Sequence, residues 1–292
     1  MVRPELGGGV AVMRRLVAAL GVALGAGCTT GRPAFELLRV IEVHGRQGVA
    51  TDGERYFVSG SRSLYVYDKQ GALLAANETP FDALESAANH IGDISVHAGE
   101  LYAGIEQFLD GAASDIRIAV YDARTLAYLR SIEWSPASGQ REVSGVGVDP
   151  GGDALWMTDW LQGERIYRYS LSQGTYTGSM LLDPPPPFQQ GIAAHGGYLY
   201  ITADDGDAAR DEPDGLWRVP ADPAAAAGRA VRVKSFVEFR RAGEIEGLDF
   251  DAAAGEMIVL SNRGSHIVQG MPRGFLPGYE REIHELYVYR VP

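Results

Sequence analysis

Five polar residues stand at equivalent points of the chain, each next to a glycine and in front of an apolar, strand-like run. They are Gln47, Asp93, Ser144, Gln190 and Glu246. Carboxylate, amide and hydroxyl oxygens are the ligands that calcium prefers, and the same groups hydrogen-bond small polar ligands. These residues can act together only if the fold gathers them at one place.

Other polar residues stand where the following strand-like run ends, namely Glu106, Asp159, Asp204 and Asn262. His90 lies close to Asp93, and such a pair can carry out acid–base chemistry. We therefore take His90, Asp93 and Glu246 as candidate catalytic residues. Alternatively, His90 is a hydrogen-bonded structural histidine. The candidate calcium ligands are Asp93, Glu106 and Glu246, and the alternative there is a hydrated channel without metal.

The candidate ligand-binding residues are the uncharged members of this set together with one tryptophan. Trp160 begins a loop, where an aromatic side chain can anchor a ligand or partner. The full set is Gln47, Ser144, Trp160, Gln190 and Asn262.

The elements that would position these residues form an internal repeat. Its copies begin at residues 47, 92, 144, 190 and 246, and each holds three short runs rich in β-branched and aromatic residues. Glycine, aspartate or proline turns separate the runs, as expected for strands. A fourth run follows the first four copies, at 72–76, 126–134, 175–182 and 231–239. This spacing predicts one four-stranded propeller blade per copy.

The ends of the chain complete the pattern. The fifth copy ends at Pro292 without a fourth strand, whereas the strand-like run 35–43 precedes the first copy and belongs to no blade. Pairing the two would close a ring and remove open sheet edges. The sequence predicts an all-β chain in which residues 35–292 form one five-bladed β-propeller. A ring of six blades is the alternative.

Propeller geometry indicates where the site should lie. The inner strand of each blade begins at one face, here called the top face, and the loop between the second and third strands returns to it. These loops are long in four blades, and the longest is predicted to run irregularly over 263–284. Long loops on a rigid scaffold commonly carry function, so the top face is the predicted working face.

Composition excludes several classes of function. The 292 residues carry a net charge of −12, whereas non-specific nucleic-acid binding needs a basic surface, so no nucleic-acid partner is expected. The single cysteine rules out a disulfide framework and zinc sites made of several thiolates. No nucleophile elbow, P-loop or zinc-protease motif is present.

The N-terminus is predicted to be a targeting segment. Residues 16–27 form a 12-residue apolar run behind two arginines, too short to span a bilayer but typical of a signal peptide. The small residues before Cys28 resemble a bacterial lipobox, which implies cleavage before Cys28 and its lipidation. We assign 1–27 as signal peptide and 28–34 as tether. By the sorting rule of Gram-negative lipoproteins, Thr29 implies the outer membrane, facing the periplasm or the cell surface. An ordinary cleaved signal peptide is the alternative.

The repeat resembles bacterial β-propellers of the NHL, YVTN and lactonase type. The segment 246–250, with 260–262 behind it, is similar to the repeat unit of phytase-like and esterase-like propellers. Ser144 and Glu246 at the mouth of five blades also resemble the calcium-activated apyrases. This resemblance implies the propeller fold, a calcium ion in the channel and hydrolysis of a phosphoester or lactone.

Two hypotheses for function follow. In the first, a lipid-anchored propeller of the cell envelope binds a small ligand, a glycan or an envelope protein through its top face. The long loops and the uncharged Gln47 and Gln190 favour it. In the second, the protein is a calcium-dependent hydrolase of a phosphoester or lactone.

Overall fold

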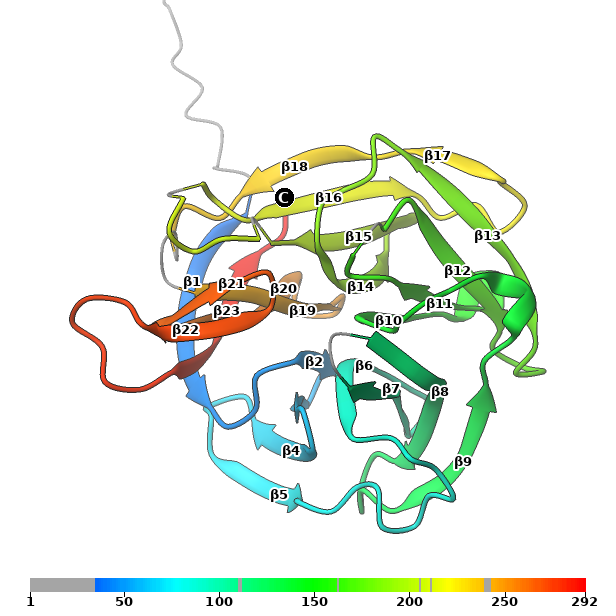
Figure 1. Ribbon diagram of the computed structural model, residues 1–292, viewed down its shortest axis with the longest axis horizontal. Helices are drawn as coiled ribbons and strands as arrows, with labels where there is room; N and C mark the ends of the chain where they lie inside the picture. Colours follow the sequence, from blue (N-terminus) through cyan, green and yellow to red (C-terminus); the bar gives the residue numbers. More distant parts are fainter. Residues whose placement is uncertain (1–34, 110–111, 162, 205, 211, 239–242) are drawn as a thin grey trace, which may run out of the picture. The chain divides into compact units, whose positions relative to one another are not determined.

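The computed structural model describes residues 35–292 apart from 110–111, 162, 205, 211 and 239–242. These residues form an all-β protein of five blades arranged in a ring (Figure 1). The predicted signal peptide 1–27, the lipidation site Cys28 and the tether 28–34 lie outside the described residues. Within the described part, the structure contains no helix that is long and apolar enough to cross a membrane.

Each blade is a four-stranded antiparallel sheet whose innermost strand faces the channel. From the channel outward, blade 1 contains β2 (Gly48–Thr51), β3 (Arg55–Gly60), β4 (Ser63–Asp68) and β5 (Leu73–Asn77). Blade 2 contains β6 (His90–His97), β7 (Glu100–Leu109), β8 (Ala112–Asp122) and β9 (Tyr128–Glu133). Blade 3 contains β10 (Gly145–Asp149), β11 (Ala154–Thr158), β12 (Arg165–Ser170) and β13 (Tyr176–Asp183).

The last two blades repeat the arrangement. Blade 4 contains β14 (Gln189–His195), β15 (Tyr198–Ala203), β16 (Gly215–Pro220) and β18 (Val231–Ser235). Blade 5 contains β19 (Gly243–Asp251), β20 (Glu256–Arg263), β23 (Ile283–Arg290) and β1 (Glu36–Val43). Of two short 3₁₀ helices, η1 (Pro136–Ser138) lies in the connection from blade 2 to blade 3, and η2 (Pro150–Gly152) lies between β10 and β11 of blade 3. The predicted five-bladed propeller is confirmed.

The ring closes through the two ends of the described chain. Strand β1 pairs antiparallel with β23, from Glu36 opposite Arg290 to Val43 opposite His284 (Figure 1). The Arg290 and Glu36 side chains also form an ion pair of 2.6 Å across this seam. The strand predicted at 35–43 therefore completes blade 5, because an unpaired β23 would leave an open edge.

Apolar side chains fill the space between neighbouring blades. The described residues form five such clusters, one at each interface between blades, and the side chains come from strands that are buried on both faces. Phe57 of blade 1 meets Ile94 of blade 2 in one cluster, and Trp156 of blade 3 meets Ile201 of blade 4 in another. Burying one such side chain contributes about 1.5–3 kcal/mol. This packing holds the inner strands in fixed positions around the channel.

The structure differs from the sequence prediction in three connections. The loop 263–284 is not irregular throughout, because β21 (Ser265–Val268) and β22 (Met271–Phe275) form a hairpin within it. The hairpin turns at Gln269 and Gly270, both with positive φ, as a two-residue turn requires. Strands β7 and β8 pair as far as Leu109 and Ala112, so much of the long loop expected between the second and third strands of blade 2 is strand. Strand β17 (Ala227–Arg229) pairs parallel with β13 of the neighbouring blade.

Candidate functional site

A cavity of about 250 Å³ lies at the top face, where the inner strands begin. Its wall contains residues from all five blades. Seven of the residues singled out in the sequence line it: Gln47, His90, Glu106, Ser144, Trp160, Gln190 and Glu246. We call this cavity the inner pocket.

Irregular strand geometry aims several of these side chains. The pairing register shifts between Ile91 and Ile94 in β6, and a similar irregularity occurs in β14 around Gln190. In β19 the register shifts between Ile245 and Leu248, which brackets Glu246. A bulge inserts an extra residue and turns its side chain out of the regular alternation. The bulged inner strands therefore present polar residues to the channel mouth while the rest of each strand packs against neighbouring blades.

One side of the inner pocket is a charged network around Arg46. Its guanidinium lies 3.4 Å from the Glu244 carboxylate and 3.3 Å from that of Glu282. Gln190 donates a 2.9 Å hydrogen bond from Nε2 to Oε1 of Glu244. Burial acts against the charge of Arg46, but the surrounding carboxylates outweigh it and raise its pKa. The guanidinium therefore remains charged and neutralises part of this wall.

Glu246 is held from the side by Asn262. The Asn262 amide donates to Oε1 of Glu246 over 2.6 Å and to the carbonyl of Arg46 over 3.0 Å. His284 Nδ1 lies 2.8 Å from Oδ1 of Asn262. Burial, followed by repulsion from Glu244, raises the pKa of Glu246 well above its usual value. Asn262 itself is fully buried and acts on the pocket through Glu246.

The opposite wall carries His90 and Glu106. His90 Nδ1 lies 3.2 Å from Oε1 of Glu106, while Oε2 of Glu106 accepts a 2.8 Å hydrogen bond from the backbone N–H of Val143. A histidine–carboxylate pair of this kind can bind a polar group or move a proton. The predicted partner of His90 was Asp93, whereas the contact in the structure is with Glu106.

Two more carboxyls stand next to Glu106. Glu142 accepts a 2.7 Å hydrogen bond from the backbone N–H of Leu161, and Asp159 accepts one of 2.8 Å from the Tyr167 hydroxyl. Burial, with repulsion from Glu106 and Asp159, raises the pKa of Glu142 to about 7. Burial likewise raises the pKa of Asp159 to about 6. These hydrogen bonds come from neutral donors, the backbone N–H of Leu161 for Glu142 and the hydroxyl of Tyr167 for Asp159.

The remaining predicted residues of the wall have neutral partners. Gln47 donates to the Ser61 hydroxyl over 3.2 Å, and the Ser144 hydroxyl lies 2.9 Å from that of Thr158. These contacts fix the two side chains in the pocket wall. Neither contact is one that activates a serine as a nucleophile, which requires an adjacent general base.

Asp93 lies apart from the residues that line the inner pocket. Asp93 follows its glycine instead of preceding it, so it occupies the position at which the other four copies of the repeat have glycine and, contrary to the expectation from the sequence, is not equivalent to the residues that open those copies. Its side chain is fully buried. Its Oδ2 accepts a 3.3 Å hydrogen bond from the backbone N–H of Ile192 in blade 4, while Oδ1 packs against the backbone of Gly48 and Gly247. Burial raises the pKa of Asp93 well above its usual value. The carboxyl thus joins inner strands of different blades in the centre of the ring.

A second, more apolar cavity of about 620 Å³ adjoins the inner pocket, and we call it the outer cleft. The two cavities share five lining residues: Phe108, Glu142, Trp160, Gln269 and Met271. Trp160 packs on Phe188 with ring centroids 5.0 Å apart, so the indole is fixed at the boundary between them. The β21–β22 hairpin contributes Gln269 and Met271, which explains how the longest loop serves the site.

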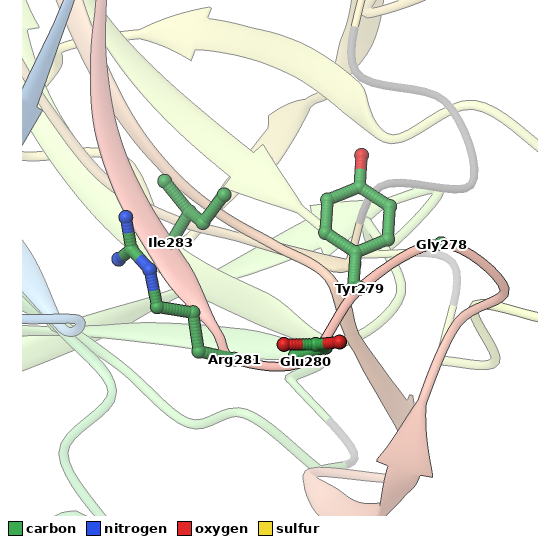
Figure 2. A pocket seen from close by; sticks show the side chains of 5 residues that line it. All are labelled: Gly278, Tyr279, Glu280, Arg281 and Ile283. Atoms are coloured by element: carbon green, nitrogen blue, oxygen red, sulfur yellow. The ribbon is translucent and has the colours of Figure 1, made fainter.

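A third cavity, of about 670 Å³, is lined by residues 278–281 of the loop before β23 and by Ile283 at the start of β23. Figure 2 shows Tyr279, Glu280 and Arg281 pointing in different directions from this loop. Arg281 instead pairs with Glu42 of β1 over 2.9 Å. Because its polar groups do not converge, this cavity is a weaker candidate than the inner pocket.

No group of three or more His, Cys, Asp and Glu side chains in the described residues is arranged to hold a metal ion. Of the predicted calcium ligands, Glu106 and Glu246 line the inner pocket, whereas Asp93 lies outside its lining. The calcium site therefore stays a prediction. Elemental analysis of the purified protein would test it.

The residues of the inner pocket that sequence reasoning missed include Arg46, Phe108, Glu142 and Glu244. A signal for two of them was available. Glu142 and Glu244 each stand two residues before a predicted lining residue, Ser144 and Glu246, and side chains two apart in an extended chain share a face.

No known protein family matches this chain, and no curated protein resembles its sequence. Solved structures share the fold. The WD40 repeats of RRP9 match with a TM-score of 0.50 at 10% identity, over 88% of this chain and 99% of that one. The PQQ-bound aldose sugar dehydrogenase of Streptomyces coelicolor gives a TM-score of 0.46 at 13% identity, over 87% and 98%.

These likenesses concern the fold alone. The chain is a five-bladed β-propeller with a polar pocket at the mouth of its channel. Propellers support ligand binding, partner binding and hydrolysis in general, so the particular function has to be argued from the pocket.

Proposed function

We propose that this protein is a lipid-anchored binding protein of the cell envelope that holds a small ligand in the inner pocket. The observation that carries the proposal is the convergence of polar side chains from all five blades on one cavity. A concave site with a few fixed polar groups and titratable residues of perturbed pKa is typical of ligand binding. The resemblance of the N-terminus to a lipobox supports the anchored, envelope location.

Binding is favoured over hydrolysis by the contacts of the carboxyls. Glu246 is engaged by Asn262, and Glu244 by Arg46 and Gln190. Side chains held in this way are suited to presenting fixed hydrogen-bonding groups to a ligand. The glutamines in the wall add neutral donors and acceptors of the same kind. A glycan end or a side chain of an envelope protein would meet the same groups as a free small molecule.

The experiment is a ligand screen by thermal unfolding. The purified full-length protein is heated with panels of small amines, sugars and organic acids. We expect one class to raise the melting temperature, because a ligand that binds only the folded state stabilises it by mass action. Glu246→Gln should weaken that shift, whereas Glu78→Gln, at an exposed position after β5, should leave it unchanged. If no class stabilises the protein, or if both variants respond like the wild type, the proposal fails.

Hydrolysis is distinguished in the same samples. Release of phosphate from phosphoesters, or opening of lactones, that requires calcium and disappears in Glu246→Gln would favour the hydrolase instead. Binding without turnover would favour the proposal.

A further inference from the structure

The outer cleft and the inner pocket form one continuous site with two different halves. The inner half is polar, and the outer half is lined by large apolar side chains, among them Phe108, Trp134 and Met271. Several apolar side chains at the rim are exposed, including Leu161 at 52% and Met271 at 52%. Exposed apolar side chains gathered beside a pocket mark a binding surface more often than chance.

Carboxyls outnumber basic groups in this combined site. Its lining includes Glu106, Glu142, Glu244 and Glu246 on the acidic side, with Asp115 at the rim already paired with Arg117. The arginines of the lining are Arg46, which is engaged by Glu244 and Glu282, and Arg141. The pocket therefore offers a cation a more favourable environment than an anion.

The carboxyl of Glu142 stands at the junction of the two halves. It lines both cavities, and it accepts a 2.7 Å hydrogen bond from the neutral backbone N–H of Leu161. Burial, together with repulsion from Glu106 and Asp159, raises the pKa of Glu142. A cation next to Glu142 would relieve this repulsion, because a buried carboxylate is costly unless it is paired.

Buried polar atoms without a partner gather in the same region. Among the described residues, they include Nε1 of Trp134, Oε1 of Gln140 and Nε1 of Trp160, all in the lining of the outer cleft. Nε of Arg46 in the inner pocket belongs to the same group. The two indole N–H groups and the Arg46 Nε–H are donors, which an ammonium ion cannot satisfy, whereas Oε1 of Gln140 is an acceptor that needs an N–H donor. A buried acceptor left unpaired destabilises the fold, so the Gln140 carbonyl in the lining of the outer cleft indicates that a ligand supplies a donor there.

Aromatic rings complete the environment. Trp160 is fixed against Phe188, and Phe108 lies 5.9 Å from the His90 ring, measured between centroids. The face of an aromatic ring attracts cations and also packs against apolar groups. Trp160 and Phe108 line both halves, so a ligand that spans the junction contacts them.

We infer that the ligand is an organic cation with an apolar or aromatic group, its ammonium head at Glu106 and Glu142 and its apolar part in the outer cleft. This inference rests on the proposed function and specifies its ligand class. A neutral polyol would satisfy the hydrogen bonds but would leave the carboxyls uncompensated. A simple inorganic cation would compensate the charge but would leave the apolar cleft unused.

The test compares matched probes by isothermal titration calorimetry on the full-length protein at pH 8. The probes are 2-phenylethylamine, its neutral analogue 2-phenylethanol, and methylamine, which carries only the head. We expect 2-phenylethylamine to bind at least about tenfold more tightly than either of the other probes, because 2-phenylethanol lacks the ammonium group and methylamine lacks the aromatic ring. Glu142→Gln should reduce the affinity for 2-phenylethylamine by about tenfold and change that for 2-phenylethanol little.

Control variants separate the two halves of the site. Trp160→Ala should weaken both aromatic probes, and Glu78→Gln should weaken neither. If Glu142→Gln does not fold, Glu106→Gln replaces it, since Glu106 lies beside the same proposed head position.

Two results would overturn the inference. If 2-phenylethanol binds as tightly as the amine, or if 2-phenylethylamine does not bind, the ligand is not an aromatic cation. The proposed function would still stand if a sugar or an acid from the ligand screen bound in the inner pocket. If no probe of any class binds, both the inference and the proposed function fail.

Discussion

Replacement of Glu142 by glutamine should stabilise the protein, and the gain should grow with pH. The pKa of Glu142 is raised from 4.5 to about 7 in the folded protein. When the pKa of a carboxyl is higher in the folded than in the unfolded protein, the protein is most stable at a pH below the unfolded-state pKa. This stability is lost as the pH rises to and through the folded-state pKa, because the buried carboxyl must then ionise. The wild type should therefore lose stability between about pH 4.5 and pH 7 through this one group.

The magnitude follows from the two pKa values. The carboxyl destabilises the folded protein by about 1 kcal/mol at pH 5 and by about 3 kcal/mol at pH 8. Glutamine has nearly the same shape, and its Oε1 can still accept the hydrogen bond from Leu161. Glu142→Gln should therefore raise the melting temperature at pH 8 by about 6–12 °C and at pH 5 by about a third of that.

Differential scanning calorimetry at pH 5 and pH 8 measures the effect. Glu78→Gln is the matched control, because the same chemical change at an exposed site should give equal, small shifts at both pH values. A gain for Glu142→Gln that does not depend on pH would refute the reasoning, since the destabilisation would then not come from its ionisation.

Three further predictions concern the ring and the N-terminus. Gly247→Ala should destabilise the protein by about 1–3 kcal/mol in urea unfolding, because the methyl group of the new alanine would clash with Asp93 and with the backbone of Gly48. Adding Asp93→Gly to this variant should recover part of the lost stability. Additive losses would contradict the proposed clash. Asn262→Leu should cost about 2–4 kcal/mol, since it leaves the buried Glu246 without its amide donor; an unchanged urea midpoint would argue against that contact. Cys28→Ser should move the protein from the membrane fraction to the soluble fraction and abolish labelling by fatty acid, and labelling that persists would disprove lipidation at this position.

The architecture could be predicted in detail because each blade of the propeller corresponds to one copy of a sequence repeat. Runs rich in β-branched and aromatic residues recur at blade spacing, and the unassigned run 35–43 matches the strand missing from the fifth copy. The strand propensity of each run and the need to pair the open edge of the fifth blade both favour the same closed ring, so few other arrangements satisfy both. The channel mouth could be predicted for the same reason, since each repeat contributes its opening residue to one ring.

The details of the pocket could not be predicted in this way. Whether a side chain at the mouth points into the cavity depends on the bulges in β6, β14 and β19, which no single repeat reveals. Asp93 looks like a pocket carboxyl in the sequence, yet it is buried against other inner strands. Its surroundings come from three blades that lie far apart in the chain.

The sequence by itself therefore determined the fold class, the number of blades, the closing strand and seven of the residues that line the inner pocket. Only the tertiary structure decided that His90 pairs with Glu106, that Glu142 joins two cavities and that the β21–β22 hairpin borders the site. Strand formation depends on neighbours in sequence, whereas pocket shape, burial and the resulting pKa values depend on how separate blades approach one another. Those distances are fixed only when the whole ring is packed.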